Sequence, residues 1–246
     1  MKSYGAFAYV YDQLMKDVDY EGWVEYIEKI FKRYKLVPSN IAELACGTGN
    51  ITNRLAAKGY NLLGVDISED MLSMAQEKAA DMDIEVIYLN HDMREMMLPT
   101  ELDVILCICD GINYIVEPKD LTRVFVAVYQ HLKENGLFIF DISSHYKLKN
   151  ILGNHTYAEN LQKVSYIWEN YFDEKRNICD FDLTIFVEEG RLYKKYEESH
   201  SQRAYKENEI IEKLMQTNFR KIEAFDAFTF EEPREESERI YFVCQK

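Results

Sequence analysis

The sequence predicts an α/β fold: a doubly wound, mostly parallel sheet with helices on both faces, into which an antiparallel β-sheet is inserted. Short continuous apolar runs alternate with helical patterns over the first 144 residues, as is typical of parallel strands buried on both faces. Between residues 145 and 205, apolar and polar residues alternate, which indicates antiparallel strands. With 246 residues, 47% of them hydrophobic, the chain is long enough to bury a full core.

The core elements follow one another along the chain. Apolar residues at helical spacing predict helices over residues 20–35, 68–79 and 118–132. Short apolar runs predict strands over residues 41–46, 62–66, 84–89, 102–109 and 137–142. Ser68 is predicted as an N-cap, Pro118 as the opening of its helix and Gly136 as the turn just past that helix.

Residues 145–205 are predicted to form an inserted subdomain, so that the core comprises residues 1–144 and 206–246. Alternation within the insertion predicts a meander of three strands, over residues 164–168, 179–187 and 192–202. A helix over residues 208–217 and two strands near 222–228 and 239–244 then return the chain to the core sheet as a hairpin.

A glycine turn and an acid indicate a nucleotide-like ligand. The first apolar run ends in Gly47-x-Gly49, and the second ends in Asp66. Such a turn lets the backbone approach a ligand, and a carboxylate at the end of the second strand can accept both hydroxyls of a ribose. The third glycine of a dinucleotide loop would stand at position 52, which is Thr52. The pattern therefore favours an adenosine-containing cofactor other than a dinucleotide, with a turn used only for packing as the alternative.

The segment Glu43-x-Ala45-x-Gly47-x-Gly49 resembles the first motif of the class I S-adenosylmethionine-dependent methyltransferases, acid-x-Gly-x-Gly-x-Gly. Ala45 stands where the family has its first glycine. The resemblance continues through the later strands and covers most of the chain. It implies a Rossmann-like fold whose last strand is antiparallel, with S-adenosyl-L-methionine as cofactor and S-adenosyl-L-homocysteine as product.

The resemblance also implies roles for individual residues. The leading acid orders the loop and approaches the methionine end of the cofactor, while an acid after the third strand bonds the adenine amino group. These places are occupied by Glu43 and Asp92. The predicted cofactor-binding residues are Glu43, Ala45, Gly47, Gly49, Asp66, Ile67, Met71, Asp92, Met93, Cys109 and Tyr11. The Tyr11-Asp12 pair resembles part of a lid over the cofactor, which makes residues 1–19 a candidate lid arm; an arm that packs on the insertion is the alternative.

The insertion leaves the core after Asp141-Ile-Ser-Ser144, at the sheet edge that carries the ligand-binding loops. We therefore expect it to form the acceptor pocket, with a purely structural cap as the alternative. An acceptor that must lose a proton needs a base within hydrogen-bond reach. The candidate catalytic residues are His200, His145 and Asp110, and the candidate substrate-binding residues are Arg203 and Tyr114.

The net charge and the motifs of the chain limit the kinds of methyl acceptor that we expect. The net charge of −14 favours a small-molecule acceptor over a nucleic acid, whose phosphates attract basic surfaces. Cys109-Asp-Gly-Ile-Asn113 stands where a methyltransferase of base amino groups would carry an Asn-Pro-Pro-Tyr-like motif. The alternatives are a methyltransferase that acts on RNA or protein, a non-catalytic cofactor-binding module and an NAD-dependent oxidoreductase. Nothing in the sequence indicates an oligomeric state.

Five cysteines without a scaffold-like spacing favour a reducing compartment. We read Cys107 and Cys109 as core and strand-end residues, because no second ligand pair accompanies them, and we predict no metal site. The chain has no apolar run of about 18 residues and no signal-like start, so the expectation is a cytoplasmic protein that does not span a membrane.

Overall fold

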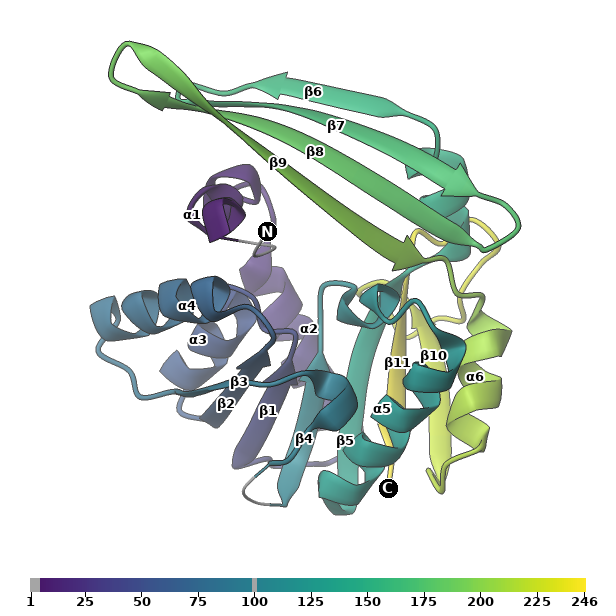
Figure 1. Cartoon of the computed structure of the whole chain (residues 1–246). Coiled ribbons are helices and arrows are strands. Elements are labelled where there is room, and N and C mark those ends of the chain that lie inside the picture. The colour runs from purple at the N-terminus through teal and green to yellow at the C-terminus, as the bar shows by residue number, and fades with distance from the viewer. Residues whose placement is uncertain (1–4, 99–100) are drawn as a thin grey trace.

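The computed structural model describes residues 5–98 and 101–246. It consists of a seven-stranded mixed sheet with helices on both faces, and a four-stranded antiparallel sheet that lies across one end of it (Figure 1). None of the helices in these two ranges is long and apolar enough to cross a membrane. The four residues that begin the predicted N-terminal arm lie outside the described residues.

The core sheet has the order β10-β11-β5-β4-β1-β2-β3. Its strands are β1 (Asn40–Leu44), β2 (Asn61–Asp66), β3 (Ile87–Asn90), β4 (Leu102–Cys107), β5 (Leu132–Ser143), β10 (Lys221–Asp226) and β11 (Arg239–Gln245). Strands β1 to β5 pair in parallel, and β11 runs antiparallel to both of its neighbours. The predicted doubly wound, mostly parallel sheet with an antiparallel last strand is thereby confirmed. Strand order reverses between β1 and β4, which places a ligand crevice at their carboxyl ends.

Six helices and three short helical turns are described. The helices are α1 (Gly5–Leu14), α2 (Tyr20–Arg33), α3 (Asn50–Ala57), α4 (Glu69–Asp81), α5 (Pro118–His131) and α6 (Glu207–Met215). The short turns are η1 (Met93–Glu95), η2 (Gly111–Tyr114) and η3 (Lys147–Leu152). Ser68 caps α4 by accepting a hydrogen bond from the Met71 N–H at 3.3 Å, and Pro118 opens α5, as the sequence predicts.

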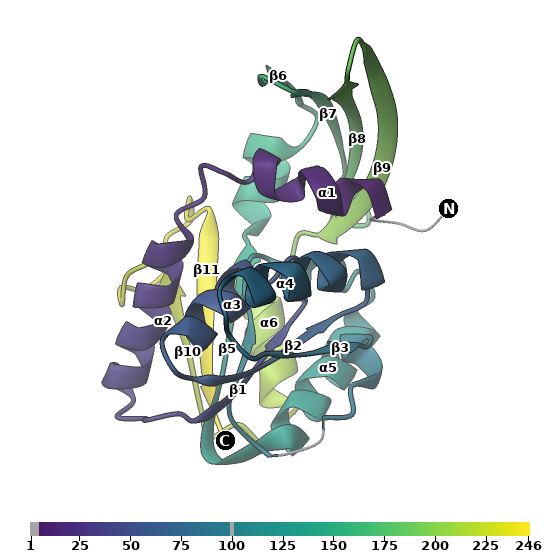
Figure 2. The same cartoon turned by 90° about the vertical axis from the view of Figure 1, so that its left-hand side faces the viewer.

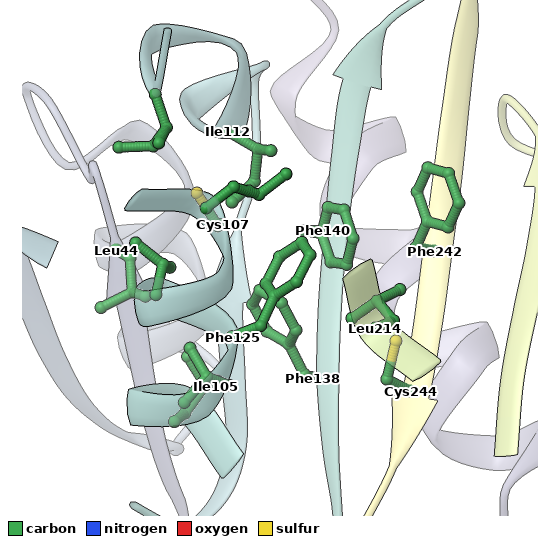
Figure 3. Close-up of a cluster of buried hydrophobic side chains, with 14 of the residues drawn as sticks. Leu44, Ile105, Cys107, Ile112, Phe125, Phe138, Phe140, Leu214, Phe242 and Cys244 are labelled. Carbon is green, nitrogen blue, oxygen red and sulfur yellow. The ribbon is translucent and has the colours of Figure 1, made fainter. Parts of the chain in front are cut away.

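The core has two hydrophobic clusters, one on each face of the sheet, because alternate residues of a strand point to opposite faces. One cluster lies under α5 and α6 and includes Phe125, Phe138, Phe140 and Phe242 (Figure 3). The other lies under α2 and α3 and is built from the intervening residues of the same strands, such as Ile139. This two-sided burial explains why the strands read as continuous apolar runs.

Two local predictions were wrong. Helix α5 ends at His131, so Gly136 does not cap it; Gly136 lies within β5, and Asn135 takes the left-handed conformation with φ 64°. Strand β3 begins at Ile87, because the N–H of Ile84 bonds back to the carbonyl of Ala79 and closes the end of α4. Residues 84–86 therefore lie outside the strand, after the turn at Met82 and Asp83.

The inserted sheet has four strands where the sequence predicted three. They are β6 (Thr156–Asn160), β7 (Val164–Asp173), β8 (Ile178–Glu189) and β9 (Leu192–Arg203), paired antiparallel in that order. Strand β6 was missed because its five residues, TYAEN, show no alternation of apolar and polar side chains. Helix α1 lies between this sheet and α4 in both views (Figures 1 and 2), and Val10 packs on Val164 and Ile185.

Candidate functional site

A cavity of about 660 Å³ extends from the carboxyl ends of β1, β2 and β4 to the inner face of the inserted sheet. Its floor is formed by the loops of the core sheet, one wall by α1, and its roof by side chains of β7, β8 and β9. The predicted residues that line it are Glu43, Ala45, Gly47, Asp66, Ile67, Met71, Asp92, Met93, Cys109, Tyr11, Tyr114, Asp110 and His200. The cavity therefore joins the glycine turn to the insertion.

The loop after β1 is held in left-handed backbone. Ala45, Gly47 and Gly49 have φ of 52°, 54° and 72°. This region favours glycine, so Ala45 is the residue that carries strain. Its methyl group also restricts the neighbouring loop, since a Cβ on Gly111 would lie 2.9 Å from the Ala45 Cβ. The departure from the family motif is thus accommodated by a second glycine across the cavity floor.

The two glycines of the turn serve different purposes. A Cβ on Gly47 would meet nothing within 4 Å, so this residue faces open space in the cavity. A Cβ on Gly49 would lie 2.6 Å from the hydroxyl of Tyr88 and 3.0 Å from the Cβ of Ala75. Gly49 does not line the cavity, and its small size lets α3 pack closely against α4 and β3. We therefore no longer count Gly49 as a contact residue for a ligand.

Asp66 sits at the end of β2 and holds the turn in place. Its Oδ2 accepts a hydrogen bond from the Gly47 N–H at 2.8 Å, and its Oδ1 accepts one from the Ser68 N–H at 2.9 Å. Burial raises the pKa of this carboxyl, while the backbone donors act in the opposite direction. Each carboxylate oxygen has a second lone pair, so Asp66 can still accept hydroxyl groups from the cavity side.

Glu43 lies deeper, at 2% exposure, and bonds the hydroxyl of Thr52. Burial raises the pKa of Glu43 to about 8, with the Thr52 bonds opposing the shift. A carboxyl in this position accepts a proton or a cation readily, because removal from water disfavours its isolated charge. Thr52, which stands at the place of the missing third glycine, thus has a role of its own.

Asp92 and Met93 line the cavity beyond the end of β3. The carboxylate of Asp92 accepts hydrogen bonds from the backbone N–H of Arg94 at 2.8 Å and from its Nε at 2.9 Å. Arg94 holds the pKa of Asp92 below its usual range. The carboxylate of Asp92 is therefore ionised, can accept hydrogen bonds from a ligand, and is oriented by Arg94.

Helix α1 is tied to the glycine turn through Asp12. Its carboxylate accepts hydrogen bonds from Thr48 Oγ1 at 2.7 Å, Asn50 Nδ2 at 2.9 Å and Lys78 Nζ at 2.8 Å. The adjacent Tyr11 faces the cavity, where burial raises the pKa of its hydroxyl well above the usual value. The predicted Tyr11-Asp12 pair therefore joins the N-terminal arm both to the loop and to the cavity, while α1 also packs on the insertion.

Asp110 belongs to a charged cluster at the centre of the cavity floor. Its Oδ1 pairs with Arg239 Nη2 at 2.9 Å, and its Oδ2 accepts a hydrogen bond from Gln202 Nε2 at 2.7 Å. Arg239 also pairs with the buried Asp141, which accepts the Cys109 N–H at 2.7 Å. The carboxylate of Asp110 is therefore placed to orient Gln202 and Arg239.

His200 faces the cavity from β9, and its ring lies 6.2 Å from that of Tyr114 in an edge-to-face arrangement. Burial lowers the pKa of His200, so its imidazole is neutral near pH 7. A neutral imidazole can take a proton from a bound molecule. The imidazole of His200 is therefore in the charge state that a general base needs.

His145 and Arg203 do not line the cavity, so we no longer count them as candidates. His145 lies 3.3 Å from Asn177 Oδ1, near the turn between β7 and β8. Arg203 follows Gln202 on β9 and points to the other face of the sheet, where its guanidinium lies over the ring of Tyr205. The sequence could not distinguish these positions, because the choice of face depends on strand pairing.

The cavity has further lining residues that sequence reasoning did not select. They include Trp23, Lys147, Tyr166, Trp168, Phe181, Leu183, Gln202 and Arg239. Their sequence neighbourhoods show only ordinary strand or helix patterns, so no local signal identified them. No group of three or more acidic, histidine or cysteine side chains suited to a metal ion occurs among residues 5–98 and 101–246.

The fold and the cavity place the chain in a class of α/β proteins that bind a ligand at the carboxyl edge of the sheet. The features of this class are the glycine turn, the acid at the end of β2 and the crevice where the strand order reverses.

Comparisons with known proteins identify the family. A family model described as a methyltransferase domain matches residues 41–136. The Bacillus subtilis (strain 168) protein YqeM, which is named as a methyltransferase, is 34% identical to this chain. The match covers 99% of this chain and 97% of YqeM. A Geobacillus sp. (strain WCH70) protein, also named as a methyltransferase, matches at 34% over 99% of this chain and 100% of its own.

A crystal structure of an S-adenosylmethionine-dependent methyltransferase from Clostridium acetobutylicum ATCC 824 has the same fold, with a TM-score of 0.90, 36% identity and 98% coverage of both chains. The sugar N-methyltransferase KedS8 of Streptoalloteichus shares the fold with a TM-score of 0.80 at 16% identity, over 97% of this chain and 92% of its own. The chain belongs to the class I S-adenosylmethionine-dependent methyltransferases.

Proposed function

We propose that this methyltransferase acts on a small-molecule acceptor, which it binds between the carboxyl edge of the core sheet and the inserted sheet. The observation that carries the proposal is the continuity of the cavity, which runs from Gly47 and Asp66 to Trp168 and His200. A roof of aromatic side chains over this space suits a compact molecule. The net charge of −14 supports the same choice, since it offers little attraction to a nucleic acid.

The floor of the cavity fits S-adenosylmethionine. When bound, the cofactor supplies a methyl group carried on a positively charged sulfur. Gly47 leaves open space where a side chain would intrude, and Asp66 offers acceptors for ribose hydroxyls. Glu43 would lie toward the methionine end and Asp92 toward the adenine. These residues bind and orient, which is the protein's main contribution in reactions of this kind.

On the acceptor side, His200 would take the proton that a hydroxyl or amine loses on methylation. Asp110 would orient Gln202 and Arg239, because its carboxylate bonds both. The aromatic side chains of the roof would exclude water. Helix α1, held by Asp12 against the glycine turn, would close the remaining side.

Two measurements test the proposal. Calorimetry should show S-adenosylhomocysteine binding to the wild type, and Asp66→Asn should weaken that binding by at least about tenfold, since bonds to a charged acceptor are worth about 1.5–3 kcal/mol. Asp81→Asn, an exposed site at the far end of α4, is the matched control. Incubation with cofactor and fractionated small-molecule extracts should then release S-adenosylhomocysteine. Product formation only with RNA or protein fractions would overturn the acceptor class.

A further inference from the structure

Lys147 places a cation on the wall of the cavity, at the start of η3, where the chain leaves β5 for the insertion. It lines the cavity together with Leu152, Trp168 and Gln202. The side chain is partly buried, and burial lowers the pKa of its ammonium group. No pattern in the sequence singles out this lysine.

Within the described ranges, Lys147 has no ion pair and its ammonium has no hydrogen-bond acceptor. The other two cations that line the cavity are both paired. Arg94 binds Asp92, and Arg239 binds Asp110 and Asp141. Among the Lys and Arg side chains that line the cavity in the described ranges, Lys147 is therefore the one whose charged group makes no hydrogen bond. An ammonium group carries three N–H donors.

The nearby carboxylates bond other groups and not the ammonium of Lys147. Asp110 uses its two oxygens for Arg239 and Gln202. Asp141 accepts from Arg239 and from the backbone of Cys109. Together with Glu238 these acids favour the charged form of Lys147 only at longer range, while Arg239 opposes it. An anionic group in the cavity would supply the close partner that this ammonium lacks.

The part of the cavity wall that the inserted sheet forms is mostly apolar. The pairs Trp168–Leu183 and Phe181–His200 are cross-strand neighbours, so their side chains share the inner face of the sheet. The Trp168 and Phe181 rings lie 5.6 Å apart, and Tyr166 extends the surface toward α1. Rings of this kind bind flat, apolar bodies.

We propose that Lys147 is a specificity-determining residue, which pairs with an anionic group on an acceptor whose remaining body is apolar and carries a ring. This inference rests on the proposed function, because it assigns the chemistry of the acceptor in the same cavity. Lys147 holds the anion, while Trp168 and Phe181 pack on the ring. A carboxylate, sulfonate or phosphate group satisfies the same requirement for negative charge.

Two fluorescent probes of matched shape test the assignment. 8-Anilino-1-naphthalenesulfonate is anionic, and N-phenyl-1-naphthylamine has the same rings without the sulfonate. Both are titrated into protein saturated with S-adenosylhomocysteine, whose affinity is measured first by calorimetry. We expect the wild type to bind the anionic probe at least about tenfold more tightly than the neutral one.

Lys147→Met should remove most of that preference by weakening the anionic probe about tenfold, with the neutral probe unchanged. Lys147→Arg keeps the charge and should retain the preference. Lys149→Met is the matched control: Lys149 lies two residues further on, outside the cavity, and pairs with Glu174 at 2.8 Å. Trp168→Phe should reduce energy transfer from tryptophan to the bound probe, which reports that the probe lies in this cavity.

The outcomes separate this inference from the proposed function. Equal affinity for the two probes in the wild type, or an unchanged preference in a folded Lys147→Met variant, overturns the role of Lys147 and leaves cofactor binding intact. If Lys147→Met does not fold, Lys147→Gln is measured in the same way. Failure of the wild type to bind S-adenosylhomocysteine would instead overturn the proposed function.

Discussion

Gln202 of β9 donates a hydrogen bond through Nε2 to Oδ2 of Asp110 at 2.7 Å. The two residues are 92 positions apart, and this bond joins the inserted sheet to the loop that follows β4. Arg239 of β11 holds the other oxygen of Asp110. The floor and the roof of the cavity are therefore fixed to each other through one carboxylate.

Replacing Gln202 should loosen this connection. Gln202 is buried at 4% exposure, so Gln202→Leu leaves one oxygen of Asp110 without its partner. We expect the free energy of unfolding to fall by about 1–3 kcal/mol, measured by urea denaturation. Gln130→Leu, on the exposed face of α5, should change it by no more than about 0.5 kcal/mol. Equal effects of the two changes would contradict a structural role for the bond.

Gly47 and Gly190 form a matched pair that separates backbone strain from ligand contact. Both have positive φ, 54° and 69°, and a Cβ on either would meet nothing within 4 Å. Valine at each site should therefore cost a similar free energy of unfolding, about 1–2 kcal/mol. Calorimetry should show that only Gly47→Val abolishes binding of S-adenosylhomocysteine. Native affinity in folded Gly47→Val would show that the turn does not cradle the cofactor.

Glu43 should make stability depend on pH in the ligand-free protein. Its pKa is raised to about 8 in the folded state from an ordinary value of 4.5, so folding takes up a proton between these values. The contribution is fully present below pH 4.5 and is lost as the pH rises through about 8.

Urea unfolding across this pH window, in wild type and Glu43→Gln, isolates the contribution of Glu43 from other buried groups such as Asp141. The wild type should lose more stability than Glu43→Gln as the pH rises. Parallel curves for the two proteins would mean that Glu43 is not protonated in the folded state.

His200 should act on the acceptor and not on the cofactor. With an acceptor found by the extract screen, His200→Asn should lower kcat about 100-fold or more if the acceptor loses a proton in the reaction. The affinity for S-adenosylhomocysteine should stay unchanged. Because burial lowers the pKa of His200, wild-type activity should rise with pH through a value below the ordinary 6.5 and then level off. His145→Asn, outside the cavity, is the control, and an equal loss in both variants would remove His200 as the base.

Local patterns in the sequence were sufficient for the core of the fold. Continuous apolar runs predicted the parallel strands, because burial on both faces demands apolar side chains at every position. The glycine turn and Asp66 could also be predicted from the sequence, because a turn at a strand end that must approach a ligand accepts few residue types. Strand β6 and the start of β3 were not predicted correctly, because short polar strands and helix-closing turns leave weak patterns.

The tertiary structure decided which side chains share the cavity. On β9, His200 and Gln202 face inward, while Arg203 faces outward, because register and the period of two fix the face of each residue. Lys147, Gln202 and Arg239 meet only through long-range pairing of strands and insertion. The sequence by itself thus determined a methyltransferase core with its cofactor turn. The composition of the acceptor wall depended on contacts between distant segments, which no local pattern encodes.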